Sequence, residues 1–310
     1  MIDVKEQVVL APYTTFKIGG PARYFTEVSD ATGVTEAFEW AEKNEVPTFV
    51  LAGGSNVLFS DQGYHGLVIH IIGEHTRLSE QTLAASAAST LSAVIFKSLE
   101  EGLGGMEYMY GIPGSLGGAV RGNAGAFGTE MADVVTKVKA VNQATGFVRE
   151  FLNAECEFGY RQSFFKKHLE WVILEVTCTL KPGGNPAELI RIAKETMAKR
   201  EAKHPQDAKC AGSFFMNPVV TNEKLLTEFE EENGSPSKNG KLPAGWLITH
   251  VGLRGKKIGG AQMSKRHPNY LVNTGNATAD DVVMLASAVK TRVRNELGIQ
   301  LREEIQFVGF

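Results

Sequence analysis

The alternation of apolar and polar positions divides the first quarter of the chain into strands joined by one helix. The stretch ARYFTEV at 22–28 alternates as a half-buried strand does. A turn follows it and leads into a segment whose apolar residues share one helical face: Val34, Ala37, Phe38 and Ala41. Apolar runs at 47–54 and 67–72 predict two further strands. Residues 1–75 are therefore predicted to form a small α/β unit.

The pattern in the middle of the chain mixes helices with a hairpin. Apolar residues at helical spacing, followed by a glycine, predict a helix over 91–102. Alternating residues on both sides of an Ala-Thr-Gly turn predict a hairpin over 134–151, and an apolar run predicts a strand over 171–180. A proline after an asparagine opens a helix over 186–203. Residues 76–203 are predicted to be a second α/β subdomain.

The last third of the chain begins with a polar stretch. Its sequence EFEEENGSPSKNGKLP, at 228–243, predicts a surface excursion rather than a domain boundary. A helix starts at Thr278 and stops at Gly298, and it belongs to a third α/β domain over 204–299. The residues QLREEIQFVGF, at 300–310, are predicted to be a strand that joins the middle subdomain.

Charge and composition limit the classes of partner that the protein is expected to bind. The chain has 310 residues, 43% of them hydrophobic, and its 32 basic and 35 acidic side chains give a net charge of −3. Lys and Arg are scattered, so nothing attracts nucleic acid or an anionic membrane. The start lacks a signal sequence, and no apolar run approaches the roughly 20 residues that span a bilayer. We expect a cytoplasmic protein without a nucleic-acid or membrane partner.

Cysteine and histidine positions predict no metal site. Cys156, Cys178 and Cys210 are odd in number and too far apart for a metal knuckle or a disulfide framework, so we expect three reduced thiols. Three histidines at 65, 70 and 75 follow steps of five, which put them on one side of neither a helix nor a strand.

Two glycine-rich stretches carry the most specific local chemistry. They are LAGGSNVLF at 51–59 and GIPGSLGGAVRGNAGAFG at 111–128. Glycine lets consecutive backbone amides converge on an anion, so a phosphate cradle is one interpretation and a pair of tight turns is the other. No G-x-G-x-x-G opens a helix after a strand, and no P-loop motif occurs, which disfavours the common dinucleotide and NTP folds. Arg121, the one charge in the second stretch, receives no role.

Six motifs together resemble a known family. They are TTFKIGGPARYF, LAGGSNVLFSD, GIPGSLGGAVRGNAGAFGTEM, FGYRQSFFK, AGSFFMNP and IGGAQMSKRHPNYLVNTGNATADDV. In order and spacing they resemble the UDP-N-acetylenolpyruvoylglucosamine reductases, the MurB flavoenzymes of peptidoglycan precursor synthesis. The resemblance implies an α+β fold: an FAD-binding fold of the vanillyl-alcohol oxidase type, made of two α/β subdomains, plus a third α/β substrate domain. The segment 180–210 lacks the tyrosine-bearing loop of one branch of this family.

The resemblance also implies a reaction and its partners. NADPH would reduce a non-covalent FAD, and the FAD would reduce UDP-N-acetylglucosamine enolpyruvate to UDP-N-acetylmuramate. The enzyme would be a UDP-N-acetylmuramate dehydrogenase, and we expect a monomer. The residues implied to bind the cofactor are Gly53, Gly54, Ser55, Asn56, Gly114, Ser115, Gly117, Gly118, Asn123 and Gly125.

Three residues match the catalytic positions of the family. Arg161 would bind the substrate carboxylate, Ser213 would protonate the carbon beside it, and Glu304 would stabilise the developing enolate. Without the resemblance, each has a plainer interpretation as a surface ion pair, a turn or cap serine, and a solvated carboxylate beside Glu303. We expect the two glutamates to point to opposite faces of the terminal strand. Substrate contacts are implied for Tyr160, Lys203, Asn217 and His267.

Two other functions remain as alternatives. One is an oxidase or dehydrogenase of another substrate on the same flavin fold. The other is a nucleotide-binding protein that keeps the cradle and lacks turnover.

Overall fold

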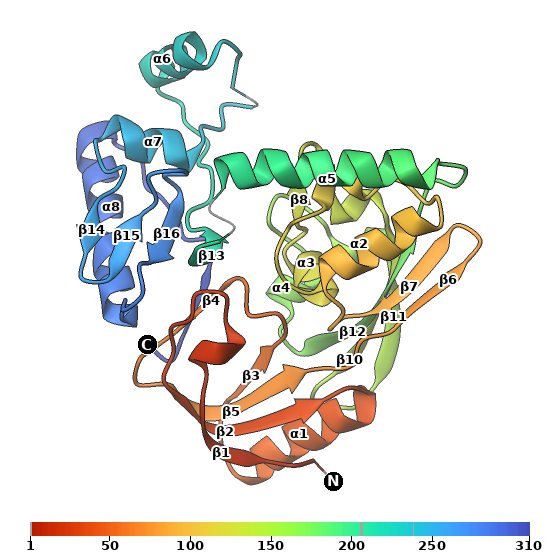
Figure 1. Ribbon diagram of the computed structural model, residues 1–310. Helices are drawn as coiled ribbons and strands as arrows, with labels where there is room; N and C mark the ends of the chain where they lie inside the picture. Colours follow the sequence, from red (N-terminus) through yellow and green to blue (C-terminus); the bar gives the residue numbers. More distant parts are fainter. Residues whose placement is uncertain (1, 205–206, 238) are drawn as a thin grey trace. The chain divides into compact units, whose positions relative to one another are not determined.

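The chain divides into two structural units, and most of their helices and strands are labelled in Figure 1. The structure is a computed structural model that describes residues 2–204, 207–237 and 239–310. The first unit holds the residues up to Val8 together with Pro21–Gly54 and Tyr64–Arg200. The second holds Val9–Gly20, Ser55–Gly63 and Glu201–Phe310. The helix α5 (Pro186–Lys203) carries the chain from the first unit into the second.

A four-stranded sheet in the order β1-β2-β5-β3 opens the first unit. Its strands are β1 (Lys5–Val9), β2 (Pro21–Val28), β3 (Thr48–Leu51) and β5 (Tyr64–Ile71). The last three are parallel, and α1 (Ala31–Lys43) connects β2 to β3. Asp30 caps α1, because its carboxylate accepts a hydrogen bond from the Gly33 amide at 2.8 Å. The predicted apolar stripe of α1 is buried, which confirms the predicted strand and helix pattern in this region.

An antiparallel sheet in the order β11-β10-β12-β7-β6 forms the rest of this unit. Its strands are β6 (Thr76–Ser79), β7 (Thr82–Ser86), β10 (Val135–Asn142), β11 (Val148–Leu152) and β12 (Trp171–Thr179). The hairpin of β10 and β11 confirms the predicted one. The helices and the small hairpin beside the sheet are α2 (Leu91–Glu100), α3 (Leu116–Arg121), α4 (Phe164–Lys167), β8 (Gly125–Ala126) and β9 (Thr129–Glu130).

The core of the antiparallel sheet buries two of the three thiols. Cys156 and Cys178 pack with the apolar side chains of β7, β10 and α2. Burial raises the pKa of both thiols to about 12, so they stay protonated at neutral pH. Neither forms a disulfide.

The second unit combines a sheet in the order β13-β16-β15-β14 with three helices and a two-stranded parallel pair. Its elements are β4 (Val57–Phe59), β13 (Lys209–Ser213), α6 (Glu223–Asn233), α7 (Ala244–His250), β14 (Lys257–Ile258), β15 (Ala261–Met263), β16 (Tyr270–Asn273), α8 (Ala279–Leu297) and β17 (Gln306–Val308). Short 3₁₀ turns complete the described chain at Ala11–Tyr13, Glu107–Met109, Met131–Asp133 and Asn153–Cys156.

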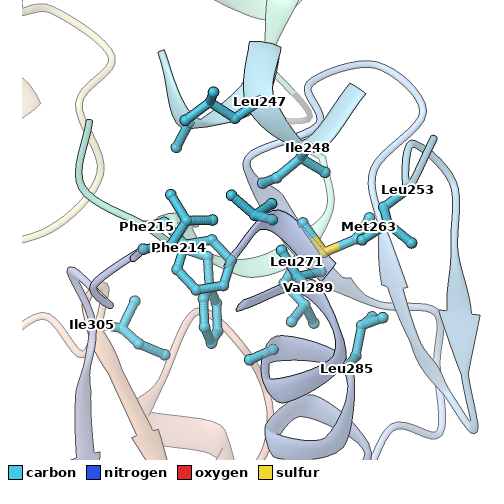
Figure 2. Packing of buried hydrophobic residues seen from close by; sticks show 14 of the residues in the cluster. Phe214, Phe215, Leu247, Ile248, Leu253, Met263, Leu271, Leu285, Val289 and Ile305 are labelled. Carbon is cyan, nitrogen blue, oxygen red and sulfur yellow. The ribbon is translucent and has the colours of Figure 1, made fainter. Parts of the chain in front are cut away.

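The helix α8 and two phenylalanines organise the core of this unit. Thr278 caps α8, and Gly298 ends it in the left-handed region at φ +71°, as the sequence predicts. Figure 2 shows Phe214 and Phe215, each 1% exposed, packed in the cluster that includes Val289 of α8. The segment that follows Ser213 is therefore held in place by buried aromatic rings.

The structure refines one expectation in this part of the chain and corrects another. The stretch 228–243 is exposed over 231–236, as expected of a surface excursion, but it begins inside α6, whose Leu225 and Phe229 lie one helical turn apart and are buried. The strand expected over 300–310 is only β17, three residues long. It pairs with β4 of its own unit and not with the middle subdomain, since the buried strand β4 needs a backbone partner. The division into three domains stays a prediction.

In the described ranges, no helix is both long and apolar enough to cross a membrane.

Candidate functional site

The two glycine-rich stretches meet in the first unit. A Cβ atom on Gly53 would lie 2.8 Å from the Ser115 amide nitrogen and 3.0 Å from the Gly114 Cα atom. Gly54 and Gly114 adopt φ +58° and +111°, which side chains other than glycine rarely tolerate. The stretches predicted separately from the sequence therefore pack backbone on backbone, and any side chain at Gly53 would force them apart.

The remaining glycines of the second stretch divide by what surrounds them. A Cβ atom on Gly117 would lie 2.7 Å from that of Ala87, and one on Gly125 would lie 2.6 Å from a side chain of β9. These two glycines serve close packing. A Cβ atom on Gly118 would meet only the Ser115 hydroxyl, at 3.3 Å, so this glycine borders open space. Fewer glycines of this stretch are therefore open to a ligand than the sequence predicted.

Two polar side chains of the second stretch are bonded inside the protein. The Ser115 hydroxyl caps α3 by accepting a hydrogen bond from the Gly118 amide at 3.2 Å. Asn123 is fully buried: its Nδ2 donates to the Gly159 carbonyl at 3.1 Å, and its Oδ1 accepts from the Ala132 amide at 3.0 Å. Both side chains, predicted to contact the cofactor, therefore also make structural hydrogen bonds within the protein.

Tyr160 and Arg161 form the corner of a tight turn in the same unit. Gly159 and Gln162 close the turn by exchanging two backbone hydrogen bonds, at 3.1 and 3.0 Å. Arg161 adopts φ +56°, a strained conformation that proteins keep mainly where it serves function. Its guanidinium carbon lies 5.4 Å from the centre of the Tyr160 ring, within cation–π range. The turn presents a cation beside Tyr160, a residue that is 40% exposed.

Arg121 ends α3 with a largely desolvated side chain. Burial lowers the pKa of its guanidinium below the ordinary value, although the group stays charged at neutral pH. Its backbone carbonyl accepts a hydrogen bond from the Ser163 hydroxyl at 2.7 Å. The backbone of Arg121 therefore anchors the Ser163 side chain.

A cavity of about 370 Å³ in the second unit holds three of the predicted site residues. Ser213, Asn217 and His267 line it, whereas Lys203, exposed at the end of α5, does not. The other lining residues are Pro243, Gly245, Trp246, Thr249, Arg254, Arg266, Pro268 and Asn269. The structure therefore brings together residues that lie up to 56 positions apart in the chain.

Ser213 reaches the cavity from a bulge at the end of β13. Cys210 pairs with Val272 and Ser213 pairs with Tyr270, so β13 carries one extra residue there. Gly212 lies in this interval at φ +76°. A bulge of this kind turns the side chain that follows it away from the regular alternation.

Glu304 is tied to the residue after this serine. Its amide donates to the Phe214 carbonyl at 2.8 Å, and its carbonyl accepts from Asn56 Nδ2 at 3.2 Å. The Asn56 side chain, a predicted cofactor contact, therefore braces the candidate acid. Glu303 is ion-paired with Lys290 of α8 at 2.7 Å. Both glutamates precede β17, which corrects the expectation that they lie within the terminal strand, because this segment bridges to the segment after β13 instead.

The His267 ring is hydrogen-bonded in the cavity wall. Its Nδ1 accepts a hydrogen bond from the Asn269 amide at 3.3 Å, which favours the neutral tautomer with its hydrogen on Nε2. The ring stacks on His204 with centroids 4.7 Å apart. Burial lowers the pKa of His267, which keeps the ring neutral at pH 7.

The cavity also holds two arginines that the sequence interpretation missed. Arg254 donates from Nε to the Lys265 carbonyl at 2.7 Å, and Arg266 contacts Asp207 at 3.1 Å. Asn217 accepts the Ala244 amide at 3.0 Å and so caps α7 beside them. A single arginine in a sequence cannot be told from any solvated cation. Because the structure places both arginines in one cavity, that cavity is suited to bind an anion.

The lowered pKa of His267 predicts an acid-sensitive stability. In the unfolded chain the imidazole has an ordinary pKa of about 6.5. As pH falls through that value, the unfolded state takes up a proton that the folded state resists, so the free energy of unfolding decreases until the folded pKa is passed. We expect the melting temperature to fall less between about pH 7.5 and about pH 5 in His267→Gln than in the wild type. The exposed His65→Gln is the control, and an equal acid response in the wild type and both variants would contradict the prediction.

No group of three or more His, Cys, Asp or Glu residues in the part of the chain that the structure describes could hold a metal ion.

Two family profiles match the chain. The profile described as "UDP-N-acetylenolpyruvoylglucosamine reductase, C-terminal domain" matches residues 204–308. The profile described as "FAD binding domain" matches residues 22–151. The first range lies wholly within the second structural unit, and the second range covers both glycine-rich stretches.

Relatives extend this similarity over nearly the whole chain. The UDP-N-acetylenolpyruvoylglucosamine reductase of Solibacter usitatus is 35% identical over 308 residues, 99% of this chain and 97% of that protein. The one of Paracoccus denitrificans is 36% identical over 302 residues, 97% of this chain and 94% of that protein. The crystal structure of the MurB reductase from Thermus caldophilus superimposes with a TM-score of 0.78 at 30% identity, over 99% and 100% of the two chains. These matches confirm the predicted fold class.

Proposed function

Because the chain belongs to the UDP-N-acetylenolpyruvoylglucosamine reductase family, we propose that it reduces UDP-N-acetylglucosamine enolpyruvate to UDP-N-acetylmuramate for peptidoglycan synthesis. NADPH is the reductant and FAD the cofactor. The observation that carries the proposal is the cavity in which Ser213 shares a wall with Arg254, Arg266 and His267. A proton donor beside cationic and hydrogen-bonding groups suits an anionic sugar nucleotide that must gain a proton.

The glycine-rich stretches fit an FAD. Gly53 packs against Gly114 and Ser115 with no room for a Cβ atom, so the backbone itself forms the wall of the cradle. Gly54, Ser55 and the open side of Gly118 would meet the pyrophosphate. Bound FAD would supply hydride transfer between NADPH and the substrate, so the two substrates would never need to meet. We propose that the FAD is bound non-covalently, with no link to a cysteine or a histidine.

The second unit supplies the binding of the sugar nucleotide. Arg254 and Arg266 neutralise the diphosphate, and Asn217 and the Nε2–H group of His267 donate hydrogen bonds to it. Lys203, at the end of α5, and Tyr160, beside Arg161, remain proposed contacts of more distant parts of the substrate.

Three side chains manage charge at the reacting atoms. Arg161 binds the carboxylate, which gains negative charge when the methylene carbon receives the hydride. Ser213 gives its hydroxyl proton to the adjacent carbon and regains a proton from water, and Glu304 donates a hydrogen bond to the enolate before that transfer. Because the Glu304 amide is bonded to Phe214, the acid and the serine are held on neighbouring backbones.

The cellular setting follows from the substrates. We propose a monomer that works in the cytoplasm, where NADPH and sugar nucleotides are made, with no nucleic-acid or membrane partner. The three-domain division, with boundaries near 75 and 203, is part of the same proposal. Sedimentation of the holoprotein at its monomer mass would support the proposed monomer, and a stable dimer would contradict it.

Steady-state turnover tests the function. Under anaerobic conditions, consumption of more than one equivalent of NADPH should require the enolpyruvyl sugar nucleotide, and the product should be heavier by two hydrogens. A flavin that NADPH reduces and the sugar nucleotide does not reoxidise would indicate an oxidase or dehydrogenase of another substrate. A protein that binds the sugar nucleotide without turnover would be a binding protein.

A further inference from the structure

The turn that carries Arg161 is tied to the glycine-rich stretch on both sides. Before the turn, Asn123 donates to the Gly159 carbonyl at 3.1 Å. After it, Ser163 donates to the Arg121 carbonyl at 2.7 Å. Both side chains are fully buried. Two residues of one stretch are thus bonded to the residues that flank one turn, 36 and 42 positions away.

Neither bond is explained by local secondary structure. Ser163 stands at the start of α4, where a serine usually caps the helix, but its side chain makes no capping bond and reaches Arg121 instead. Asn123 adopts φ +43°, a conformation that asparagine tolerates better than most residues. Its side-chain amide donates to the Gly159 carbonyl and accepts from the Ala132 amide. Both residues therefore serve the connection between the two segments.

The turn needs such support. Arg161 sits at φ +56°, and a residue in this region persists only when its surroundings determine it. A third bond, from Lys166 Nζ to the Arg161 carbonyl at 2.8 Å, holds the corner itself. The backbone of the arginine is consequently fixed from three directions.

We propose that Asn123 and Ser163 are positioning residues that lock the Arg161 turn to the cofactor-binding stretch and so aim the guanidinium at the substrate carboxylate. The inference rests on the proposed function of Arg161. It explains why the one buried asparagine of the glycine-rich stretch faces the protein, and it gives the Arg121 carbonyl its role. A misplacement of about 1 Å at a reacting group can cost about 100-fold in rate.

Ser163→Ala tests the proposal, with Ser98→Ala as the matched control. Ser98 is also fully buried and donates to a carbonyl, that of Ile95, at the same distance of 2.7 Å. We expect both variants to lose similar thermal stability and to keep the FAD affinity of the wild type. Only Ser163→Ala should speed hydrogen exchange of the Gly159 and Gln162 amides. Only it should slow reoxidation of the reduced holoprotein by the enolpyruvyl sugar nucleotide, by about tenfold.

A double variant separates positioning from general loosening. If Ser163 acts through the arginine, Ser163→Ala adds no further slowing in an Arg161→Ala background. Equal slowing in both backgrounds, or exchange and reoxidation in Ser163→Ala that match Ser98→Ala, would overturn the proposal. If the wild-type reduced protein is not reoxidised by the sugar nucleotide at all, the proposed function fails. Amide exchange, which needs no substrate, then still decides whether Ser163 holds the turn.

Discussion

A Glu304→Gln variant is expected to be reduced by NADPH at the wild-type rate and to lose about 10³-fold in reoxidation by the enolpyruvyl sugar nucleotide. An amide donates a weaker hydrogen bond than a carboxylic acid and cannot share its proton with a developing enolate. The backbone of Glu304 is bonded to Phe214 and Asn56, so the substitution leaves the segment in place. Anaerobic stopped-flow measurement of the two half-reactions provides the readout.

Glu303→Gln is the natural control for this variant. Glu303 is paired with Lys290, and losing this partly exposed pair should cost at most about 1 kcal/mol of stability. We expect its two half-reactions to proceed at wild-type rates. A normal reoxidation rate in Glu304→Gln, or an equal loss in both variants, would remove Glu304 from the mechanism.

Gly53→Ala is expected to weaken FAD binding by about 10- to 100-fold, which corresponds to the 1–3 kcal/mol typical of overpacking. The new Cβ atom would lie 2.8 Å from the Ser115 amide nitrogen, and backbone cannot rotate away as a flexible side chain can. The two glycine-rich stretches would have to separate. Equilibrium titration of the apoprotein with FAD, followed by flavin fluorescence, measures the effect.

Gly122→Ala controls for the change of glycine to alanine in the same region. A Cβ atom there meets only the Gly118 carbonyl oxygen, at an ordinary 3.6 Å, and the backbone is not left-handed. Its FAD affinity should stay within about twofold of the wild type. Unchanged FAD affinity in Gly53→Ala would mean that the packing of Gly53 on Gly114 plays no part in holding the cofactor.

The sequence predicts elements well where local chemistry decides them. The turn before α1 and the glycine at 298 mark helix ends that the structure confirms, because the Asp30 cap and Gly298 each act within one turn of chain. The helix α6 escapes the same approach. Only Leu225 and Phe229 of its residues are buried, and its acidic composition resembles that of a loop.

Side-chain duties are harder to predict, because distant partners decide them. Asn123 in a glycine-rich stretch resembles a ligand donor, yet Gly159, 36 positions away, accepts its hydrogen bond. In the sequence, Arg254 and Arg266 resemble solvated cations. The structure shows that β13, α7 and the loop before β16 line one cavity, which both arginines share. In contrast, the resemblance placed Ser213 and Glu304 together, and the structure ties their backbones through Phe214. Their roles in the reaction stay predictions.

A single anaerobic titration tests the central claim most directly. The purified holoprotein should be yellow, should bleach when one equivalent of NADPH is added, and should regain its colour when one equivalent of the enolpyruvyl sugar nucleotide follows. The recovered nucleotide should be UDP-N-acetylmuramate. Bleaching that the sugar nucleotide does not reverse would contradict the account.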